Sequence, residues 1–340
     1  MKRRNFVKGA GALATFFIAH DLFAKTKQPV FGHNGMQYTM DAGWGKLNPE
    51  KFPVNDCHEM IQDSKGRIIL LTNETKNNIL IYNKSGKLLH SWGRSFPGGH
   101  GLTLADENGS DFLFITDTTT NQVFKTTLDG KILLNIQAPL ETGLYQEAKE
   151  FRPTEVAFDD NGDFFVADGY GKQHILHYDS KGNLKNHFGG RGEGDMHLDN
   201  AHGICIDRRK GAPTLLVTDR TRNCFKRFDM NGNYLEMIKL PGACVCRPVI
   251  KNKNLYAAVL RSPSMKEAGT GFVAILDENN KVVSNIGGNK PVYIDDELQT
   301  LYQEEKIFVH PHDVCVDDDE NLYVSQWASG KVYPYKFNRV

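Results

Sequence analysis

One four-strand pattern recurs six times along this sequence, and it constrains the fold more than any other feature. Each copy opens with a His, a Pro-Thr or an Arg-Pro, continues through alternating apolar residues to an acidic turn with Gly or Asn, and then adds further short apolar strands. The copies open at residues 58, 100, 153, 202, 247 and 312. Short strands joined by Asp, Asn and Gly turns at a repeat of roughly 40–50 residues are typical of propeller blades.

The repeat count predicts an all-β fold, a six-bladed β-propeller with four antiparallel strands per blade. The sixth copy has only three strands, and residues 37–40 near the other end of the chain form a spare strand. We expect this N-terminal strand to join the last blade and close the ring, because closure removes an exposed sheet edge. A β-helix or an open array of repeats is disfavoured, since neither explains the mismatch between the two ends.

Residues 1–24 have the features of an export signal. Arg3 and Arg4 are followed by Asn, Phe, Val and Lys, then by a short apolar run over residues 9–19 and by Ala24, a small residue at which a peptidase could cut. Paired arginines in this setting predict the twin-arginine pathway; a general secretory signal or an uncleaved anchor is the alternative. We expect residues 25–340 to form one propeller domain that is periplasmic or secreted, with no stable membrane insertion of the mature chain.

The charge balance excludes one class of partner. The chain has 340 residues with 41 Lys and Arg against 41 Asp and Glu, a formal net charge of zero. Nucleic-acid binding needs a basic face, and beyond the first eight residues the only basic run is the short segment 208–210. We expect no nucleic-acid partner, a monomeric protein, and a small-molecule or peptide-derived substrate.

Two polar connections do not fit the repeat. Residues 140–150 and 289–306 are longer than the other links between copies, and the second has some helical character. Long connections of a propeller lie on one rim and often shape a binding mouth, although solvated loops are the alternative.

The strongest chemical signal is a histidine at one position of the repeat. Four of the six copies open with it: His58, His100, His202 and His312. The first strand of each blade lines the central channel, so these side chains should converge on the axis. Neutral imidazole is a common zinc ligand, and three such nitrogens with one open position are typical of a catalytic zinc site. The alternative is that each histidine bonds only to neighbouring backbone.

Six cysteines are spread over the repeats: Cys57, Cys205, Cys224, Cys244, Cys246 and Cys315. They could pair in an oxidising compartment. None forms a Cys-x-x-Cys motif, and two lie within apolar inner strands, so small buried thiols are the favoured prediction. Cys57 adjoins His58 and is a minor candidate for a soft metal ligand.

Five segments, taken in order, resemble one known family: residues 99–102 (Gly-His-Gly-Leu), 152–157 (Arg-Pro-Thr-Glu-Val-Ala), 167–170 (Ala-Asp-Gly-Tyr), 201–204 (Ala-His-Gly-Ile) and 311–314 (Pro-His-Asp-Val). Together they resemble the motifs of peptidyl-α-hydroxyglycine α-amidating lyase, a six-bladed propeller of NHL-repeat type. The resemblance runs over roughly residues 36–340, and the ordered set is far more specific than any one repeat.

The resemblance implies two metals and two residues that contact substrate. Three channel histidines hold zinc in the family, and they correspond here to His100, His202 and His312. A structural calcium is bound there by two backbone carbonyls and one carboxylate, which correspond to Met60, Leu102 and Asp313. Oxygen ligands of this kind are what Ca²⁺ requires. The substrate-contacting tyrosine and arginine correspond to Tyr170 and Arg220.

The implied reaction is the cleavage of a carbinolamide, in which one carbon carries both a hydroxyl and an amide nitrogen. Zinc would polarise the hydroxyl and a base would take its proton, so that the C–N bond breaks to give an aldehyde and a free amide. Tyr170, as a phenolate with a pKa lowered by the nearby cation, is the candidate base. Arg220 could hold a substrate carboxylate in a two-pronged contact.

This chain departs from the family at positions that concern the substrate. The family has a second arginine on blade one, but residues 71–76 here contain none, and Glu74 would repel a carboxylate. His310 replaces a methionine, His58 adds a channel histidine, and Gly171 follows the tyrosine where vertebrate members have a disulfide. We therefore expect a retained metal scaffold with altered substrate recognition. One alternative is a non-enzymatic propeller that binds a protein or carbohydrate on its rim around a structural metal. A related metal-dependent hydrolase is another.

Overall fold

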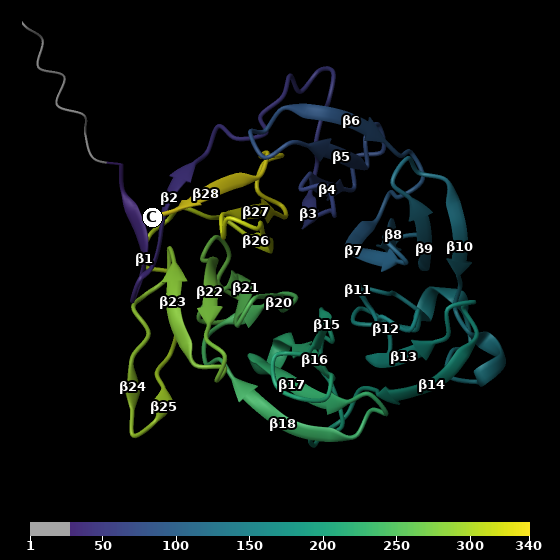
Figure 1. Ribbon diagram of the computed structural model, residues 1–340. Coiled ribbons are helices and arrows are strands. Elements are labelled where there is room, and N and C mark those ends of the chain that lie inside the picture. Colours follow the sequence, from purple (N-terminus) through teal and green to yellow (C-terminus); the bar gives the residue numbers. More distant parts are fainter. Residues whose placement is uncertain (1–27) are drawn as a thin grey trace, which may run out of the picture.

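Six antiparallel sheets stand in a ring around a central channel (Figure 1). The computed structural model describes residues 28–340, so the export signal predicted for residues 1–24 lies outside the described part of the chain and stays a prediction. The predicted six-bladed β-propeller of antiparallel four-stranded blades is confirmed. Across residues 28–340, no helix combines the length and apolar character needed to cross a membrane.

The first four blades follow chain order from the channel outward. Blade one comprises β3 (Cys57–Gln62), β4 (Ile68–Thr72), β5 (Ile79–Tyr82) and β6 (Leu88–Trp92). Blade two comprises β7 (Gly99–Glu107), β8 (Ser110–Asp117), β9 (Gln122–Thr127) and β10 (Ile132–Ile136). Blade three comprises β11 (Glu155–Phe158), β12 (Phe164–Ala167), β13 (His174–Tyr178) and β14 (Leu184–Gly189). Blade four comprises β15 (Ile204–Asp207), β16 (Thr214–Asp219), β17 (Cys224–Asp229) and β18 (Tyr234–Lys239).

The last two blades are less regular. In blade five, two short inner strands pair with the same neighbour: β19 (Cys244–Val245), β20 (Val249–Lys251), β21 (Asn254–Arg261), β22 (Phe272–Leu276) and β23 (Val282–Ile286). Blade six contains β26 (Pro311–Val316), β27 (Leu322–Gln326), β28 (Tyr335–Arg339), β2 (Met36–Asp41) and β1 (Val30–His33).

The two ends of the described chain close the ring together. Strand β2 pairs antiparallel with β28, so that Tyr38 lies opposite Arg339. The predicted closing strand is therefore confirmed. Strand β1 adds a fifth strand to blade six, and the His33 amide donates to the Ser284 hydroxyl of β23 at 2.7 Å. The closed ring leaves no inner strand without a neighbouring blade.

Strands in the middle of each blade are apolar on both faces because every blade is packed between two others. Strands β4 and β5 are buried along their whole length, whereas the outer strand β6 is partly exposed. Between blades one and two, Ile69, Leu71 and Ile81 form one cluster with Leu113 and Ile115. Burial of apolar surface supplies roughly 25 cal/mol per Å², so these cores stabilise the ring and hold the inner strands around the channel.

The two long connections differ from one another. Residues 140–150 contain two single 3₁₀ turns, η1 (Leu140–Thr142) and η2 (Ala148–Glu150). Residues 289–306 contain a small hairpin, β24 (Tyr293–Ile294) with β25 (Glu297–Leu298), so the expected helical character was wrong. Asp295 and Asp296 both have positive φ, at 49° and 66°, and such left-handed residues make a tight hairpin turn instead of a helical one.

Candidate functional site

Four histidines meet on the axis of the propeller. His58, His100 and His312 lie on the inner strands β3, β7 and β26, and His202 lies two residues before the start of β15. The His100 ring centre lies 4.8–4.9 Å from those of the other three, and none of the four side chains is more than 6% exposed. The predicted convergence of these side chains on the channel is therefore what the structure shows.

Backbone carbonyls fix the orientation of two of these rings. His100 Nδ1 lies 2.9 Å from the Thr154 carbonyl, and His312 Nδ1 lies 3.0 Å from the His58 carbonyl. Gly101 makes the first contact possible, because an added Cβ there would lie 2.5 Å from the same Thr154 oxygen. With Nδ1 donating to a carbonyl, Nε2 carries the free lone pair that a metal ligand needs.

The other two rings have buried nitrogens without hydrogen-bond partners in the described part of the chain. These are both nitrogens of His202 and Nδ1 of His58. Burying a polar atom without a partner costs free energy, and a bound metal would supply the missing interaction.

The candidate ligand atoms are close enough to share an ion. They form two overlapping groups within 4.8 Å, His58 with His100 and His312, and His202 with Cys246 and His312. Zinc–nitrogen bonds of about 2.0–2.1 Å place two ligand nitrogens of a tetrahedral site about 3.3 Å apart, so side-chain adjustments of roughly an ångström would bring the nitrogens onto one ion. The donor set fits a transition metal such as zinc.

Electrostatics keep these imidazoles in the metal-binding form. Burial lowers the pKa values of His100, His202 and His312 well below the usual 6.5, and repulsion from neighbouring imidazoles and from Arg220 lowers them further. Burial also lowers the pKa of His58 to about 4. All four are neutral at pH 7, as metal coordination requires.

Tyr170 stands at the same point of the channel. Its hydroxyl lies 3.1 Å from His100 Nε2, and together with His58 and His100 it lines a cavity of about 410 Å³. Burial raises the pKa of Tyr170 above its ordinary value, and the Arg220 guanidinium opposes that rise. The phenolate expected for Tyr170 depends on a nearby cation and stays a prediction.

A carboxylate behind the turn fixes the position of Tyr170. Asp168 accepts hydrogen bonds from the amides of Arg152 and Lys172, both at 2.6 Å, and from the Tyr145 hydroxyl at 2.9 Å. These contacts tie the turn that follows β12 to the start of blade three, so Tyr170 sits on a rigid loop.

Arg220 lies deeper than expected. It is 2% exposed, and its Nε donates to the Val245 carbonyl at 3.3 Å and its Nη2 to the Cys246 sulfur at 3.6 Å. It is not one of the side chains that line the cavity. Its charge lowers the pKa values of His100, His202 and His312 and opposes the rise in the pKa of Tyr170.

Arg152 is a cavity residue that the sequence motifs contained but did not single out. It is exposed, lines the cavity, and has its guanidinium carbon 5.7 Å from the Tyr170 ring centre. Asn73, from the blade-one segment that lacks an arginine, also lines the cavity. The positive charge that borders the cavity therefore comes from the start of blade three.

Two other candidates lie apart from the imidazole cluster. His310 accepts a hydrogen bond from the Gly269 amide at 3.1 Å, and its ring centre lies 5.8 Å from that of Trp327. The Cys57 sulfur donates to the Val332 carbonyl at 3.4 Å. Neither belongs to a group that could hold a metal in residues 28–340. All six cysteines are free thiols.

The three predicted calcium ligands do lie together, but a side chain already engages them. The Met60 and Leu102 carbonyls and the Asp313 carboxylate all accept hydrogen bonds from Arg247 at 2.7–3.0 Å. The expectation of a calcium ion at these oxygens does not fit the residues present. The sequence does mark Arg247 as unusual, because it opens the fifth copy of the repeat, where four other copies have histidine.

The fold and this cluster define a class of protein: a six-bladed β-propeller with a buried histidine centre, suited to a transition metal, on its axis. No family model matches the chain. It is 42% identical over 106 residues to peptidyl-alpha-hydroxyglycine alpha-amidating lyase 1 of Drosophila melanogaster, which covers 29% of this chain and 18% of that protein. It is 34% identical over 142 residues to a probable lyase of the same name in Caenorhabditis elegans, which covers 41% of this chain and 37% of that protein. Peptidyl-glycine alpha-amidating monooxygenase B of Xenopus laevis is 26% identical over 274 residues, 74% of this chain and 28% of that protein.

These matches and the six-bladed fold support the lyase-like propeller family that the sequence motifs resemble. The matched segments span at most 37% of the first two relatives. Among solved structures, a streptogramin B lyase has a TM-score of 0.59 at 13% identity, covering 88% of this chain and 97% of that chain. A gluconolactonase of Xanthomonas campestris has a TM-score of 0.57 at 10% identity, covering 93% of this chain and 99% of that chain. At such low identity these two structures show the fold alone.

Proposed function

We propose that this protein is a metal-dependent lyase that breaks the C–N bond of a carbinolamide at one end of its central channel. The observation that carries the proposal is the convergence of four neutral imidazoles on the channel axis, where His58, His100 and Tyr170 line one cavity. The sequence similarity to amidating lyases supports the reaction class. The similarity to lactonase and streptogramin lyase structures does not bear on the reaction.

Three imidazoles would hold zinc, as the resemblance implies: His100, His202 and His312. Bound zinc would supply Lewis-acid polarisation of the substrate hydroxyl. The contribution of the chain is to keep the imidazoles neutral by burial and to fix two of them through the carbonyls of Thr154 and His58. Preorganisation of this kind removes the cost of arranging ligands during the reaction.

We assign proton transfer to Tyr170. In the reaction the hydroxyl loses its proton, its C–O bond becomes a carbonyl, the C–N bond breaks and the nitrogen gains a proton, so atoms balance without water. Tyr170 can take the first proton and return it to the nitrogen. Arg220 lowers the free-energy cost of the phenolate, since its charge opposes the rise in the Tyr170 pKa that burial causes.

We assign recognition of a substrate carboxylate to Arg152 rather than to Arg220. The Arg152 guanidinium has no hydrogen-bond or ion-pair partner within residues 28–340, and it borders the cavity. Arg220 already donates hydrogen bonds to the Val245 carbonyl and the Cys246 sulfur. A guanidinium with free donors binds a carboxylate in a two-pronged contact. We further propose that the protein acts after export, as a monomer, on a small or peptide-derived substrate.

Metal content and turnover together test the proposal. Wild-type protein is analysed for zinc and incubated with α-hydroxyhippurate, an N-acyl-α-hydroxyglycine, while benzamide and glyoxylate are quantified by chromatography. We expect about one zinc per chain and both products in equal amounts. His202→Ala should lose both properties, and His187→Ala, on the exposed outer strand β14, should lose neither.

Two outcomes would refute the lyase. The first is full zinc content with no cleavage of this or other carbinolamides, which would favour a propeller with a structural metal. The second is a protein that takes up no transition metal even after loading.

A further inference from the structure

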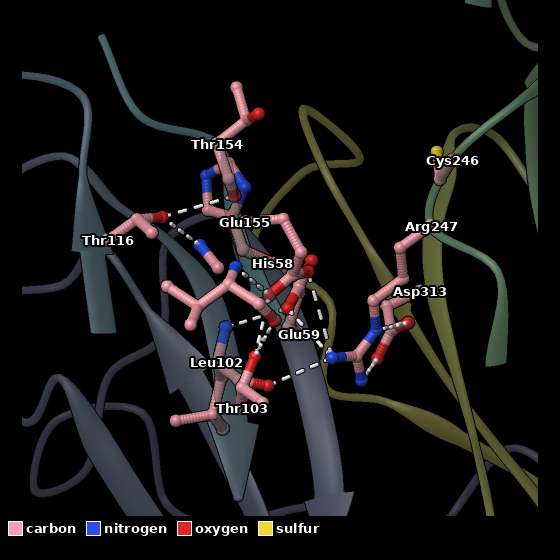
Figure 2. Close-up of polar contacts among 12 residues, drawn as sticks. His58, Glu59, Leu102, Thr103, Thr116, Thr154, Glu155, Cys246, Arg247 and Asp313 are labelled. Carbon is pink, nitrogen blue, oxygen red and sulfur yellow. Dashed lines mark hydrogen bonds and ion pairs between the residues drawn. The ribbon is translucent and has the colours of Figure 1, made fainter. Parts of the chain in front are cut away.

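A second buried cluster lies next to the channel histidines, and it carries charge. It consists of Arg247 from blade five and three carboxylates from other blades: Glu59, Glu155 and Asp313. We call these four residues the arginine–carboxylate layer (Figure 2). Glu59 and Asp313 directly follow His58 and His312 in the sequence, so the layer is one residue further along the same inner strands. Its carboxylates are at most 1% exposed, and Arg247 is 8% exposed.

Arg247 makes four hydrogen bonds across the channel, and Figure 2 shows those to the Asp313 carboxylate. Its Nε and Nη2 donate to the two carboxylate oxygens of Asp313 at 2.7 and 3.0 Å. Its Nη1 donates to the Leu102 carbonyl at 2.9 Å, and its Nη2 to the Met60 carbonyl at 2.8 Å. Nη1 also lies 3.1 Å from a Glu59 carboxylate oxygen. The planar fork of a guanidinium suits several acceptors at once, so this side chain links blade five to blades one, two and six.

The same oxygens are those of the calcium site that the sequence resemblance implies. Calcium takes 6–8 oxygen ligands at 2.3–2.6 Å. Guanidinium nitrogens already stand 2.7–3.0 Å from the Met60, Leu102 and Asp313 oxygens. An ion at coordination distance would overlap the guanidinium, so the ion and the side chain exclude one another.

Charge explains why this layer needs a cation. The Arg247 guanidinium lies 2.7 Å from an Asp313 oxygen, 3.1 Å from a Glu59 oxygen and 3.7 Å from a Glu155 oxygen. One buried cation therefore faces three buried carboxylates. Without a positive charge, three carboxylates would be buried together, which is strongly destabilising.

The backbone of blade five is adapted to this side chain. The inner strand is broken into β19 and β20, and Arg247 lies in the break beside Pro248, which has no amide hydrogen for a ladder. In blade four, Gly203 packs directly on Arg247, because an added Cβ at Gly203 would lie 2.3 Å from the Arg247 Cα. The backbone of Arg247 is therefore packed directly against blade four, in addition to the contacts that its side chain makes.

We propose that Arg247 is a built-in replacement for a divalent cation in the channel, so that the propeller neither binds nor needs calcium at this layer. The proposal also assigns Arg247 a sealing role. The layer separates the 410 Å³ histidine cavity from a second hollow of about 250 Å³, which Arg247 and later residues of the inner strands line. Substrate then reaches the histidines from one end of the channel only.

Calcium binding by the wild-type protein is the first test. The protein is stripped of metals with a chelator and reloaded with zinc alone or with zinc plus calcium chloride. Calcium content is then measured by elemental analysis and the melting temperature by calorimetry. We expect calcium no higher than background and the same melting temperature in both samples. One calcium per chain, or a melting temperature raised by calcium, would overturn the proposal. Because zinc is present in both samples and no activity is measured, the result is independent of the lyase proposal.

Variants of Arg247 then test whether the guanidinium is what prevents calcium from binding. Arg247→Ala should lower the melting temperature in zinc alone, and calcium should restore part of the loss by occupying the vacated oxygens. Arg227→Ala is the matched control, since Arg227 pairs with Asp207 and Glu236 on blade four, away from the channel, and calcium should not affect it. Arg247→Lys keeps the charge without the fork, so we expect lower stability but no calcium binding. If Arg247→Ala does not fold even with calcium, the wild-type measurement still decides the proposal.

Discussion

Replacing Tyr170 by phenylalanine should separate catalysis from folding in this protein. The change removes one hydroxyl, whose hydrogen bond to His100 Nε2 is 3.1 Å long. The ring remains, in its contacts with the His100 and His202 rings. A neutral hydrogen bond is worth roughly 0.5–1.5 kcal/mol, so the unfolding free energy should change by about 1 kcal/mol or less.

Activity should respond far more strongly than stability. A positioned proton-transfer group contributes roughly 10²–10⁴-fold to a rate, which corresponds to about 2.7–5.4 kcal/mol in the activation barrier. We expect kcat for α-hydroxyhippurate to fall by that factor while zinc content stays at the wild-type value. The assay measures kcat, KM, zinc content and melting temperature on the same preparation.

The matched control is Tyr323→Phe. Tyr323 is fully buried in blade six and donates its hydroxyl to Asp317 at 2.9 Å, outside the cavity. It should lose more stability than Tyr170→Phe, because hydrogen bonds to charged acceptors are worth roughly 1.5–3 kcal/mol, but keep its kcat. A Tyr170→Phe enzyme within twofold of the wild-type kcat would refute the assignment of Tyr170.

Three further predictions address the cavity and the imidazoles. Arg152→Ala should raise KM for α-hydroxyhippurate roughly tenfold, as loss of a charged hydrogen bond implies, and leave KM unchanged for an analogue without the carboxylate; equal effects on both substrates would remove Arg152 from recognition. His58→Ala should weaken zinc binding by at least roughly 10–100-fold, the loss that follows removal of an outer-shell partner. It should also change the visible spectrum of the cobalt-substituted protein. An unchanged affinity and spectrum would exclude His58 as a ligand. The metal-free protein should lose stability as the pH falls from about 6.5, the ordinary histidine pKa in an unfolded chain, toward about 4, the pKa to which burial lowers His58. The unfolded state takes up protons first over this range, and a melting temperature that is constant from pH 8 to pH 4 would contradict the prediction.

The repeat made the architecture and the histidine cluster predictable. Each blade repeats one four-strand pattern. The position of His100 or His202 within its copy therefore places the side chain on the channel without any knowledge of its contacts. The strand count at the two ends predicted closure in the same way. These inferences need only periodicity, which is a local property of the sequence.

Periodicity places Arg247 at the start of the fifth copy of the repeat, but it does not predict which groups Arg247 contacts. The acceptors of Arg247 include the backbone carbonyls of Leu102 and Met60, which lie 145 and 187 residues away in the chain. Every residue has a backbone carbonyl, so the residue type does not indicate which carbonyl will accept a hydrogen bond. Similarly, the depth of Arg220 follows from its hydrogen bond to the Val245 carbonyl, a contact between blades four and five. Motifs place residues near the channel, but only packing between blades decides which cation faces the cavity.

The pairing of β2 with β28 has a consequence for the order of events during synthesis. Tyr38 must wait for Arg339, 301 residues later, and a ribosome adds roughly 5–20 residues per second. Strand β2 therefore spends on the order of 15–60 s without its partner. The histidine cluster is completed equally late, because His58 and His100 are synthesised early and His312 belongs to the last blade. A growing chain thus offers an incomplete set of imidazoles to any ion it meets, and the full set forms only when the ring closes.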